Sequence, residues 1–295
     1  MPAATTHYEF SKDVYLSLDA KHADMITNLN MFYLGSQGPD LFFFNEAGIT
    51  SKSLKKLGNR MHDEKIKEVI NFLYQYSKDD NDLLSYTYGY LCHYALDTVV
   101  HPLVYYAQRH IMSNLEDEMI NHFRIEATYD KELLAYKGKD INDYDVYDAL
   151  CISDTDSVKL ASMYQKLFKE VFDLNVSFKR IQNTCKDCAF FLKLLKPNNI
   201  KYQAVTTIEN IFRAPHFVSG LMLNNNVQED VLNLNRIECT NIYEEEHQFN
   251  DTFFELYDKA KTKACRLIND PTNEQLTNLT FNGASIQKGA VTRND

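Results

Sequence analysis

Apolar residues recur every three or four positions along most of the chain. Such spacing gathers apolar side chains on one face of a helix. The stretches that show it lie near residues 10–30, 60–77, 82–108, 115–137, 155–175, 178–196 and 249–268. Gly (9) and Pro (6) are scarce among the 295 residues, whereas a β fold needs many turns. The pattern therefore predicts an all-α protein.

Two polar or turn-rich stretches interrupt this pattern. The first separates the two leading helical runs and contains Gly35, Gly38, Pro39 and Gly48. Loops of about 25 residues are uncommon in a compact domain unless they serve a function. The second begins at Pro271, and its polar composition predicts a loosely held end. We therefore expect one helical domain over residues 1–270, followed by a polar C-terminal tail over residues 271–295.

Charge and hydropathy narrow the possible partners. Hydrophobic residues make up 44% of the chain, enough for a sizeable core, and the formal net charge is −10. Such an acidic chain is a poor match for nucleic-acid phosphates, so no stable nucleic-acid complex is expected. No stretch reaches the roughly 20 apolar residues of a transmembrane helix. The N-terminal residues lack both the basic start and the apolar core of a signal peptide, which favours a cytoplasmic location.

The six cysteines are too few and too scattered for a disulfide framework. Cys185 and Cys188 have the C-x-x-C spacing of metal and redox sites. A structural zinc normally has four ligands, and the sequence offers no second pair beside them. We interpret these two residues as ordinary helix cysteines.

Chemically capable residues concentrate in the first 130 positions. His93, Asp97 and His101 are spaced four apart within the apolar run YGYLCHYALDTVVHPLVYY, so on a helix they share one face. The two histidines would be roughly 12 Å apart along the axis, too far to share one ion. Two metals are therefore implied, with Asp97 between them. A stripe of hydrogen-bonded core residues is the alternative.

Two further groups of residues give weaker evidence for a metal site. His122 and Glu126 form another pair four residues apart, a spacing with which one helix often holds one metal, although surface pairs show it too. His62 lies at the start of a helix beyond the glycine-bearing loop, and a lone histidine is often only structural.

The order of these elements resembles the bacterial zinc-dependent phospholipase C family and, more distantly, the single-strand-specific zinc nucleases. The matching residues are His7, Gln37-Gly38-Pro39-Asp40, Met61-His62, His93-x-x-x-Asp97, His101-Pro102 and His122-x-x-x-Glu126. The resemblance covers roughly residues 1–135 in motif detail. It implies a single all-helical domain of the zinc-dependent phospholipase C or nuclease type, with three zinc ions in a cleft.

The resemblance also implies a set of ligands for each ion. One zinc would be held by Asp40, His62, His93 and Asp97. A second would be held by His101, His122 and Glu126. The third would be held by His7, by Asp97 as a bridge, and by the backbone amine and carbonyl of the first residue. The secreted relatives have a Trp there, whereas this chain contains none. Pro2 is the expected replacement if Met1 is removed. The gap from Asp97 to His101 is also shorter than in the secreted enzymes.

By the same resemblance, the protein is a hydrolase that attacks a phosphodiester with zinc-activated water. Asp40 would bind zinc and also orient or deprotonate that water. A phospholipid headgroup is favoured as substrate over nucleic acid, because the acidic chain offers no basic groove. The alternatives are a zinc nuclease, a phosphohydrolase of the HD type suggested by His62-Asp63, and a helical protein with purely structural zinc.

Overall fold

The computed structural model describes residues 4–45, 54–112, 117–143, 146–224 and 227–286. Helices account for almost all of the regular structure, and β1 and β2 pair as a two-stranded antiparallel sheet. The prediction of an all-α protein is therefore confirmed.

The helical elements of the described residues lie between Ala4 and Asn269. They are α1 (Ala4–Ser17), α2 (Ala20–Met25), α3 (Leu29–Gly35), η1 (Gly38–Phe43), α4 (Lys55–Asp63), α5 (Ile66–Ser77), α6 (Asn81–Tyr106), η3 (Ala107–Ile111), α7 (Glu118–Tyr136), η4 (Ile141–Asp143), α8 (Val146–Ala149), α9 (Asp154–Phe172), α10 (Phe178–Leu194), α11 (Asn199–Ile211), α12 (Phe217–Gly220) and α13 (Phe253–Asn269). The strands are β1 (Cys239–Asn241) and β2 (Glu244–Phe249).

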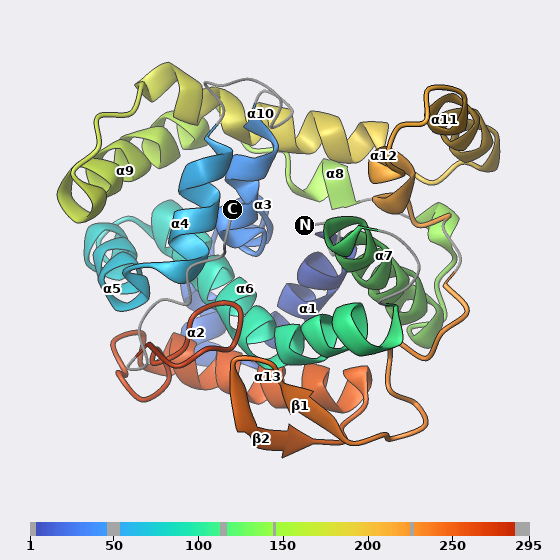
Figure 1. Cartoon of the computed structure of the whole chain (residues 1–295). Coiled ribbons are helices and arrows are strands. Elements are labelled where there is room, and N and C mark those ends of the chain that lie inside the picture. The colour runs from blue at the N-terminus through green and yellow to red at the C-terminus, as the bar shows by residue number, and fades with distance from the viewer. Residues whose placement is uncertain (1–3, 46–53, 113–116, 144–145, 225–226, 287–295) are drawn as a thin grey trace.

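Helix α6 is the central element of the fold. Asp80 caps its N-terminus by accepting hydrogen bonds from the backbone N–H groups of Asp82 and Leu83. Nearly every residue from Leu83 to Tyr105 is buried, as expected of a helix that is apolar on all sides. Figure 1 shows α6 passing through the middle of the molecule, and α1, α3, α5 and α13 pack against it.

A close crossing of α3 over α6 depends on two glycines. A Cβ atom on Gly89 would lie 2.0 Å from the carbonyl oxygen of Phe32, and one on Gly35 would lie 2.1 Å from that of Tyr86. Only residues without a side chain allow the two backbones to approach this closely. The crossing brings Ser36 and the turn that follows it next to the middle of α6.

The first predicted helix, near residues 10–30, is three helices in the structure. Asp19 accepts a hydrogen bond from the backbone N–H of His22 and caps α2. Asn28 accepts one from the backbone N–H of Met31 and caps α3. Asp and Asn compete with the helix for backbone partners, so each ends one helix and begins the next.

The sequence predicts a loosely held tail from Pro271, whereas the described part of that stretch packs on the helices up to Ile286. Phe281 is fully buried, and its ring contacts those of Tyr94, His62 and His93. The backbone N–H of Phe281 donates to the carbonyl oxygen of His62, at 3.1 Å. Among the described helices, none has the length and apolar character needed to cross a bilayer.

Candidate metal centre

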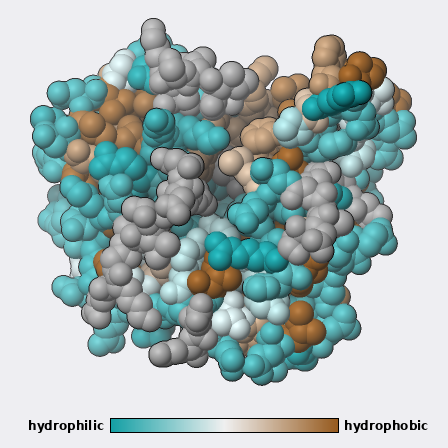
Figure 2. Space-filling model, viewed as in Figure 1, coloured by the Kyte–Doolittle hydropathy of each residue, from teal (hydrophilic) through white to brown (hydrophobic). Residues whose placement is uncertain are grey.

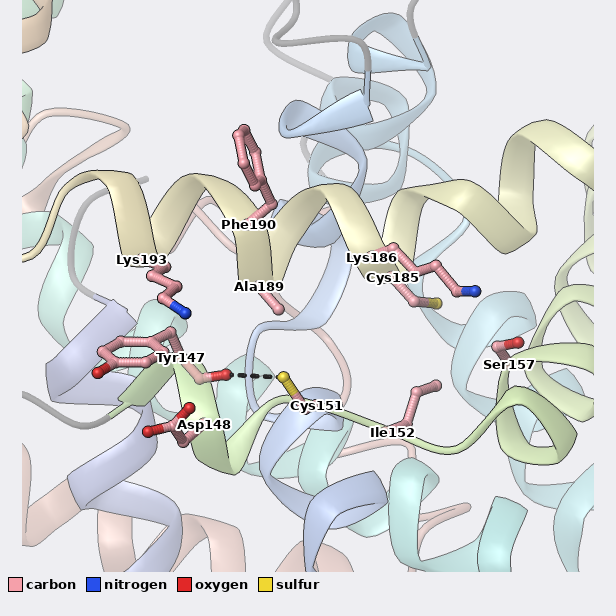
Figure 3. Close-up of a pocket in the computed structure, with 10 residues that line it drawn as sticks. All are labelled: Tyr147, Asp148, Cys151, Ile152, Ser157, Cys185, Lys186, Ala189, Phe190 and Lys193. Atoms are coloured by element: carbon pink, nitrogen blue, oxygen red, sulfur yellow. Dashed lines mark hydrogen bonds between the residues drawn. The ribbon is translucent and has the colours of Figure 1, made fainter.

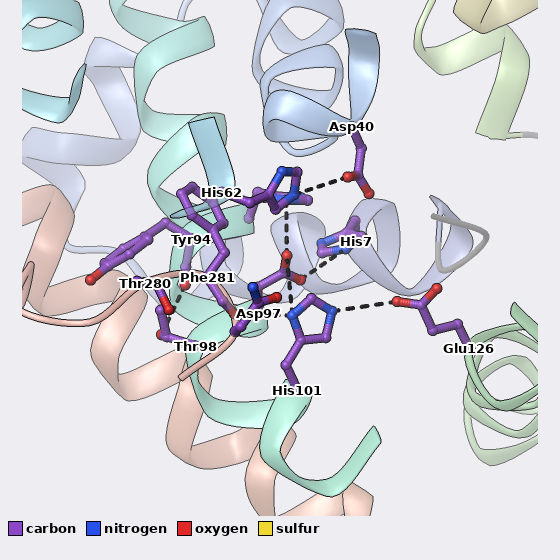
Figure 4. Close-up of polar contacts among 12 residues, drawn as sticks. His7, Asp40, His62, Tyr94, Asp97, Thr98, His101, Glu126, Thr280 and Phe281 are labelled. Atoms are coloured by element: carbon purple, nitrogen blue, oxygen red, sulfur yellow. Dashed lines mark hydrogen bonds and ion pairs between the residues drawn. The ribbon is translucent and has the colours of Figure 1, made fainter. Parts of the chain in front are cut away.

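Helix α6 presents the predicted stripe of three ligands. The Nε2 atom of His93 lies 3.1 Å from one carboxylate oxygen of Asp97, and the Nδ1 atom of His101 lies 3.8 Å from the same oxygen. All three side chains are buried. Figure 4 shows Asp97 at the centre of the cluster, between the other side chains. The four-residue spacing therefore does place these groups on one face.

Helix α1 brings His7 to the other oxygen of Asp97, at 3.3 Å. The His7 ring stacks on that of His93, with centroids 4.1 Å apart. The start of α1 is anchored by Asp130, which accepts hydrogen bonds from the backbone N–H groups of Thr5 and Thr6. The two oxygens of Asp97 thus face different histidines, the arrangement that a bridging carboxylate requires.

The glycine-bearing turn and α4 supply Asp40 and His62. The Nε2 atom of His62 lies 3.1 Å from a carboxylate oxygen of Asp40. Asp40 belongs to η1, which begins at Gly38 with φ of 51°. A Cβ atom on Gly38 would lie 2.2 Å from the His93 ring. A glycine is therefore needed for both the backbone conformation and the space beside His93.

Helix α7 supplies His122 and Glu126 from the opposite side. One carboxylate oxygen of Glu126 lies 3.3 Å from the Nε2 atom of His122 and 3.5 Å from that of His101. Side chains from two separate helices, α6 and α7, thus meet at Glu126. Glu126 is buried, so the alternative that His122 and Glu126 form only a surface pair is excluded.

The second ring nitrogens of four histidines are already occupied. The Nδ1 atoms of His62, His93 and His101 contact the backbone carbonyls of Gly58, Ser36 and Phe281, at 2.8, 3.1 and 3.0 Å. That of His122 contacts the Oε1 atom of Gln108. A carbonyl oxygen can only accept, so these Nδ1 atoms carry the proton and the Nε2 lone pair is left for a metal.

The candidate ligand atoms form three groups, each within 4.8 Å. The groups are His7, Asp40 and His93; His62, His93 and Asp97; and His101, His122 and Glu126. His93 and His101 belong to different groups, as their spacing predicts. Within the described residues, the Nδ1 atom of His7 and the Nε2 atom of His93 have no aligned hydrogen-bond partner. Buried, unsatisfied nitrogens beside carboxylates are what a zinc site needs, so the donor set fits the metal.

The ionisable side chains of the cluster lie close enough to shift one another's pKa values. Burial opposes ionisation of Asp97, but His101, His93 and His7 hold its pKa well below the usual range. Burial would also lower the pKa of His101, yet Asp97 and Glu126 raise it to about 9. Burial, followed by the neighbouring His93, lowers the pKa of His7 to about 3. Perturbations of this size in one cluster are typical of functional sites.

Several residues with a supporting role carry no signal in the sequence. Ser36 and Gly58 contribute only backbone carbonyls, which any residue could provide. Gln108 lies in η3, just beyond the motif of α6. Phe281 comes from a polar stretch 180 residues after His101, without periodic spacing to mark it.

Some candidate residues lie elsewhere. Pro2 is outside the described residues. His22 pairs with Asp19 on the surface, and His216 lies 3.7 Å from Glu209, far from the cluster in sequence. Asp63, the second residue of the possible HD pair, accepts a hydrogen bond from Asn282 and is in none of the ligand groups found among the described residues.

A hollow of about 260 Å³ lies between α8 and α10, and none of the candidate ligands lines it. Figure 3 shows that Tyr147, Cys151 and Lys193 are among the residues that line it. Cys185 and Cys188 are buried and unbonded to other cysteines, which agrees with their interpretation as ordinary helix residues.

Fold and site together define an all-helical protein with a buried histidine and carboxylate centre suited to zinc. The sequence profile of the family described as zinc dependent phospholipase C matches residues 6–175, which is more than half of the chain. The chain belongs to this family. The matched region contains every predicted ligand except Pro2. Neither a curated protein nor a solved structure gives a significant match.

Proposed function

We propose that this protein hydrolyses phosphodiesters at a cluster of two or three zinc ions, with phospholipid headgroups as the favoured substrate. One observation carries the proposal: side chains from α1, η1, α4, α6 and α7 converge into three ligand groups. Two of the groups share His93, and the third adjoins them because His101 lies 3.8 Å from Asp97. Family membership supports zinc as the metal and phosphodiester hydrolysis as the chemistry.

We assign the ligands in three sets. The first is Asp40, His62, His93 and Asp97. The second is His101, His122 and Glu126. The third is His7, Asp97 and, after removal of Met1, the terminal amine and carbonyl of Pro2. Zinc in such a cluster lowers the pKa of water toward 7 and stabilises negative charge on phosphoryl oxygens.

Asp40 is the proposed general base. Burial alone would raise its pKa, but the positive charge of the N-terminus, followed by the hydrogen bond of His62 and the charges of His93 and His62, holds the pKa below its usual value. The carboxylate is therefore ionised near neutral pH and can accept a proton from an attacking water. About 13% of its side chain remains exposed, so water can reach it.

Exposure distinguishes this proposal from a purely structural zinc site. The side chains of His62, His101 and His122 are 11, 10 and 13% exposed, whereas His93 is fully buried. Structural zinc is closed off by four protein ligands, and catalytic zinc keeps a position open for water. A partly exposed edge favours the catalytic alternative.

The test compares three substrates with the zinc-loaded protein: bis-p-nitrophenyl phosphate, short-chain phosphatidylcholine and single-stranded DNA. We expect hydrolysis of the first two, and His122→Ala should reduce both rates by about a hundredfold or more, because a ligand is lost. His247→Ala, on the exposed strand β2, is the matched control. Faster cleavage of DNA would favour the nuclease alternative, and no hydrolysis of any substrate would refute the proposal.

A further inference from the structure

Helix α11 has an unusual distribution of apolar residues. Its inward face carries Glu209, the one buried residue between Asn199 and Ile211. Its outward face carries Ile200, Ala204, Ile208 and Ile211, which fall within one quadrant at helical spacing. The isoleucines are 81, 55 and 71% exposed. Solvent-facing apolar side chains grouped in this way mark an interaction surface rather than part of the core.

The apolar stripe continues into the neighbouring elements. Phe212 directly follows α11 and is 76% exposed, while Phe217 and Val218 of α12 are 40 and 43% exposed. At the end of α10, Leu194 is 54% exposed, and its carbonyl oxygen accepts a hydrogen bond from Lys201 of α11. We call these exposed side chains, with those of α11, the apolar rim. Figure 2 shows hydrophobic surface at the upper right, where Figure 1 places α11 and α12.

The segment that carries the apolar rim is basic, although the whole chain has a formal net charge of −10. Residues 190–218 contain Lys193, Lys196, Lys201 and Arg213, and Glu209 is their single acidic residue. Glu209 is buried and accepts hydrogen bonds from the backbone N–H groups of Val218 and Ser219. Its charge is thus directed at the start of α12. Of the basic side chains, Lys201 lies against Leu194 of the apolar rim, whereas the Nζ atoms of Lys193 and Lys196 lie 5.8 Å from the centroid of the Tyr147 ring.

The apolar rim contacts α7, the helix that carries His122 and Glu126. The ring of Phe217 packs edge-on against that of Phe123, with centroids 5.1 Å apart, and Phe123 is adjacent to His122. Gly220 of α12 lies against Ile120 and Arg124 of α7. His122 is also among the more exposed ligands. The Phe217 end of the apolar rim is therefore separated from His122 by one ring, that of Phe123.

We propose that the apolar rim is a docking surface for anionic lipid bilayers. Isoleucine and phenylalanine side chains would enter the acyl boundary, and the surrounding lysines and arginine would contact lipid phosphates. This inference deepens the proposed function, on which it rests, because a lipid-cleaving centre gains from being held at the surface that contains its substrate. The surface lies beyond residue 175, outside the part of the chain that matches the family.

The test is flotation of the zinc-loaded protein with vesicles of phosphatidylcholine, alone or in equimolar mixture with phosphatidylserine. We expect binding to the mixed vesicles, weaker binding to pure phosphatidylcholine, and release by salt. The double variant I208D/I211D should bind about tenfold or more weakly. K196E/R213E should lose the preference for anionic vesicles.

Leu16→Asp on α1 is the matched control, since Leu16 is 80% exposed and outside the apolar rim. Vesicle binding by I208D/I211D at the parent level would overturn the inference, as would a parent dimer that this variant dissociates. Hydrolysis of bis-p-nitrophenyl phosphate should be equal in the parent and all three variants. If the parent binds vesicles but hydrolyses no phosphodiester, the proposed function fails and the docking surface stands.

Discussion

The ability of a side chain in this centre to bind a metal depends on the contacts that hold it in place as well as on its own chemistry. His93 touches Asp97, stacks on His7 and donates to Ser36, so its ring has little freedom to move. The backbone of Gly38 lies against the His93 ring and restrains it further, because the ring fills the space that a side chain at position 38 would need. Ligands held this firmly need little reorganisation to bind a metal.

Gly38→Ala tests this restraint. The new Cβ would meet the His93 ring at 2.2 Å and the backbone has φ of 51°, so we expect weaker zinc binding and reduced hydrolysis. Gly138→Ala is the control, because Gly138 also has positive φ, at 70°, with nothing within 4 Å of its Cβ position. The positive φ alone should cost each variant about 1–2 kcal/mol of folding free energy, and the clash with His93 adds to this cost only in Gly38→Ala. Equal zinc content in the two variants would contradict the assigned role of Gly38.

The raised pKa of His101 predicts a pH dependence that zinc should remove. Without zinc, the folded chain retains the His101 proton up to about pH 9, whereas an unfolded histidine releases it near 6.5. The stability contributed by His101 is therefore fully present below pH 6.5 and should be lost as pH rises to 9, by at most about 1.4 kcal/mol per pH unit. Burial lowers the pKa of Lys263 to about 7, which raises stability above pH 7, so the contribution of His101 must be measured as the difference between the parent and His101→Gln. Zinc-loaded parent should lose the contribution of His101, because the metal replaces the proton. Urea unfolding of both proteins without zinc measures the difference, and a difference that stays constant from pH 6.5 to 9 would contradict the account.

The sequence predicts a helix correctly where apolar residues recur at helical spacing within that helix. The long apolar helix around His93 was predictable because its period is clear and its candidate ligands share one face. Helix α11 was not, because its apolar residues face outward and its β-branched residues weaken the helical signal. The contribution of residues 276–286 was not predictable either, since the contact of Phe281 with His101 depends on tertiary packing that no local spacing encodes.

Phe281→Ala tests the contribution of this stretch. The ring is fully buried against His62, His93 and Tyr94, so its removal should reduce the free energy of unfolding by about 3–5 kcal/mol. Zinc affinity should also fall, because the carbonyl that orients His101 shifts. Leu234→Ala, at a side chain 58% exposed, should change neither quantity. Denaturant unfolding and zinc titration check both, and an unchanged stability would show that the stretch is not held as described.

At the scale of the whole molecule, helices from the first half of the chain enclose the centre, and α13 with the stretch that follows closes one side of it. The candidate ligands could be predicted because their motifs are local. Their assembly into three groups could not be derived from spacing alone. His7 reaches Asp97, Asp40 reaches His62, and Glu126 reaches His101 only through the packing of separate helices.

The most direct measurement of the central claim is zinc content per chain, by mass spectrometry on protein purified without chelator. The account predicts about two to three zinc ions in the parent, with His93→Ala and Glu126→Ala each losing about one. His247→Ala should retain the parent value, because His247 is exposed on β2. A parent that binds at most one ion, or variants that keep the full complement, would contradict the account.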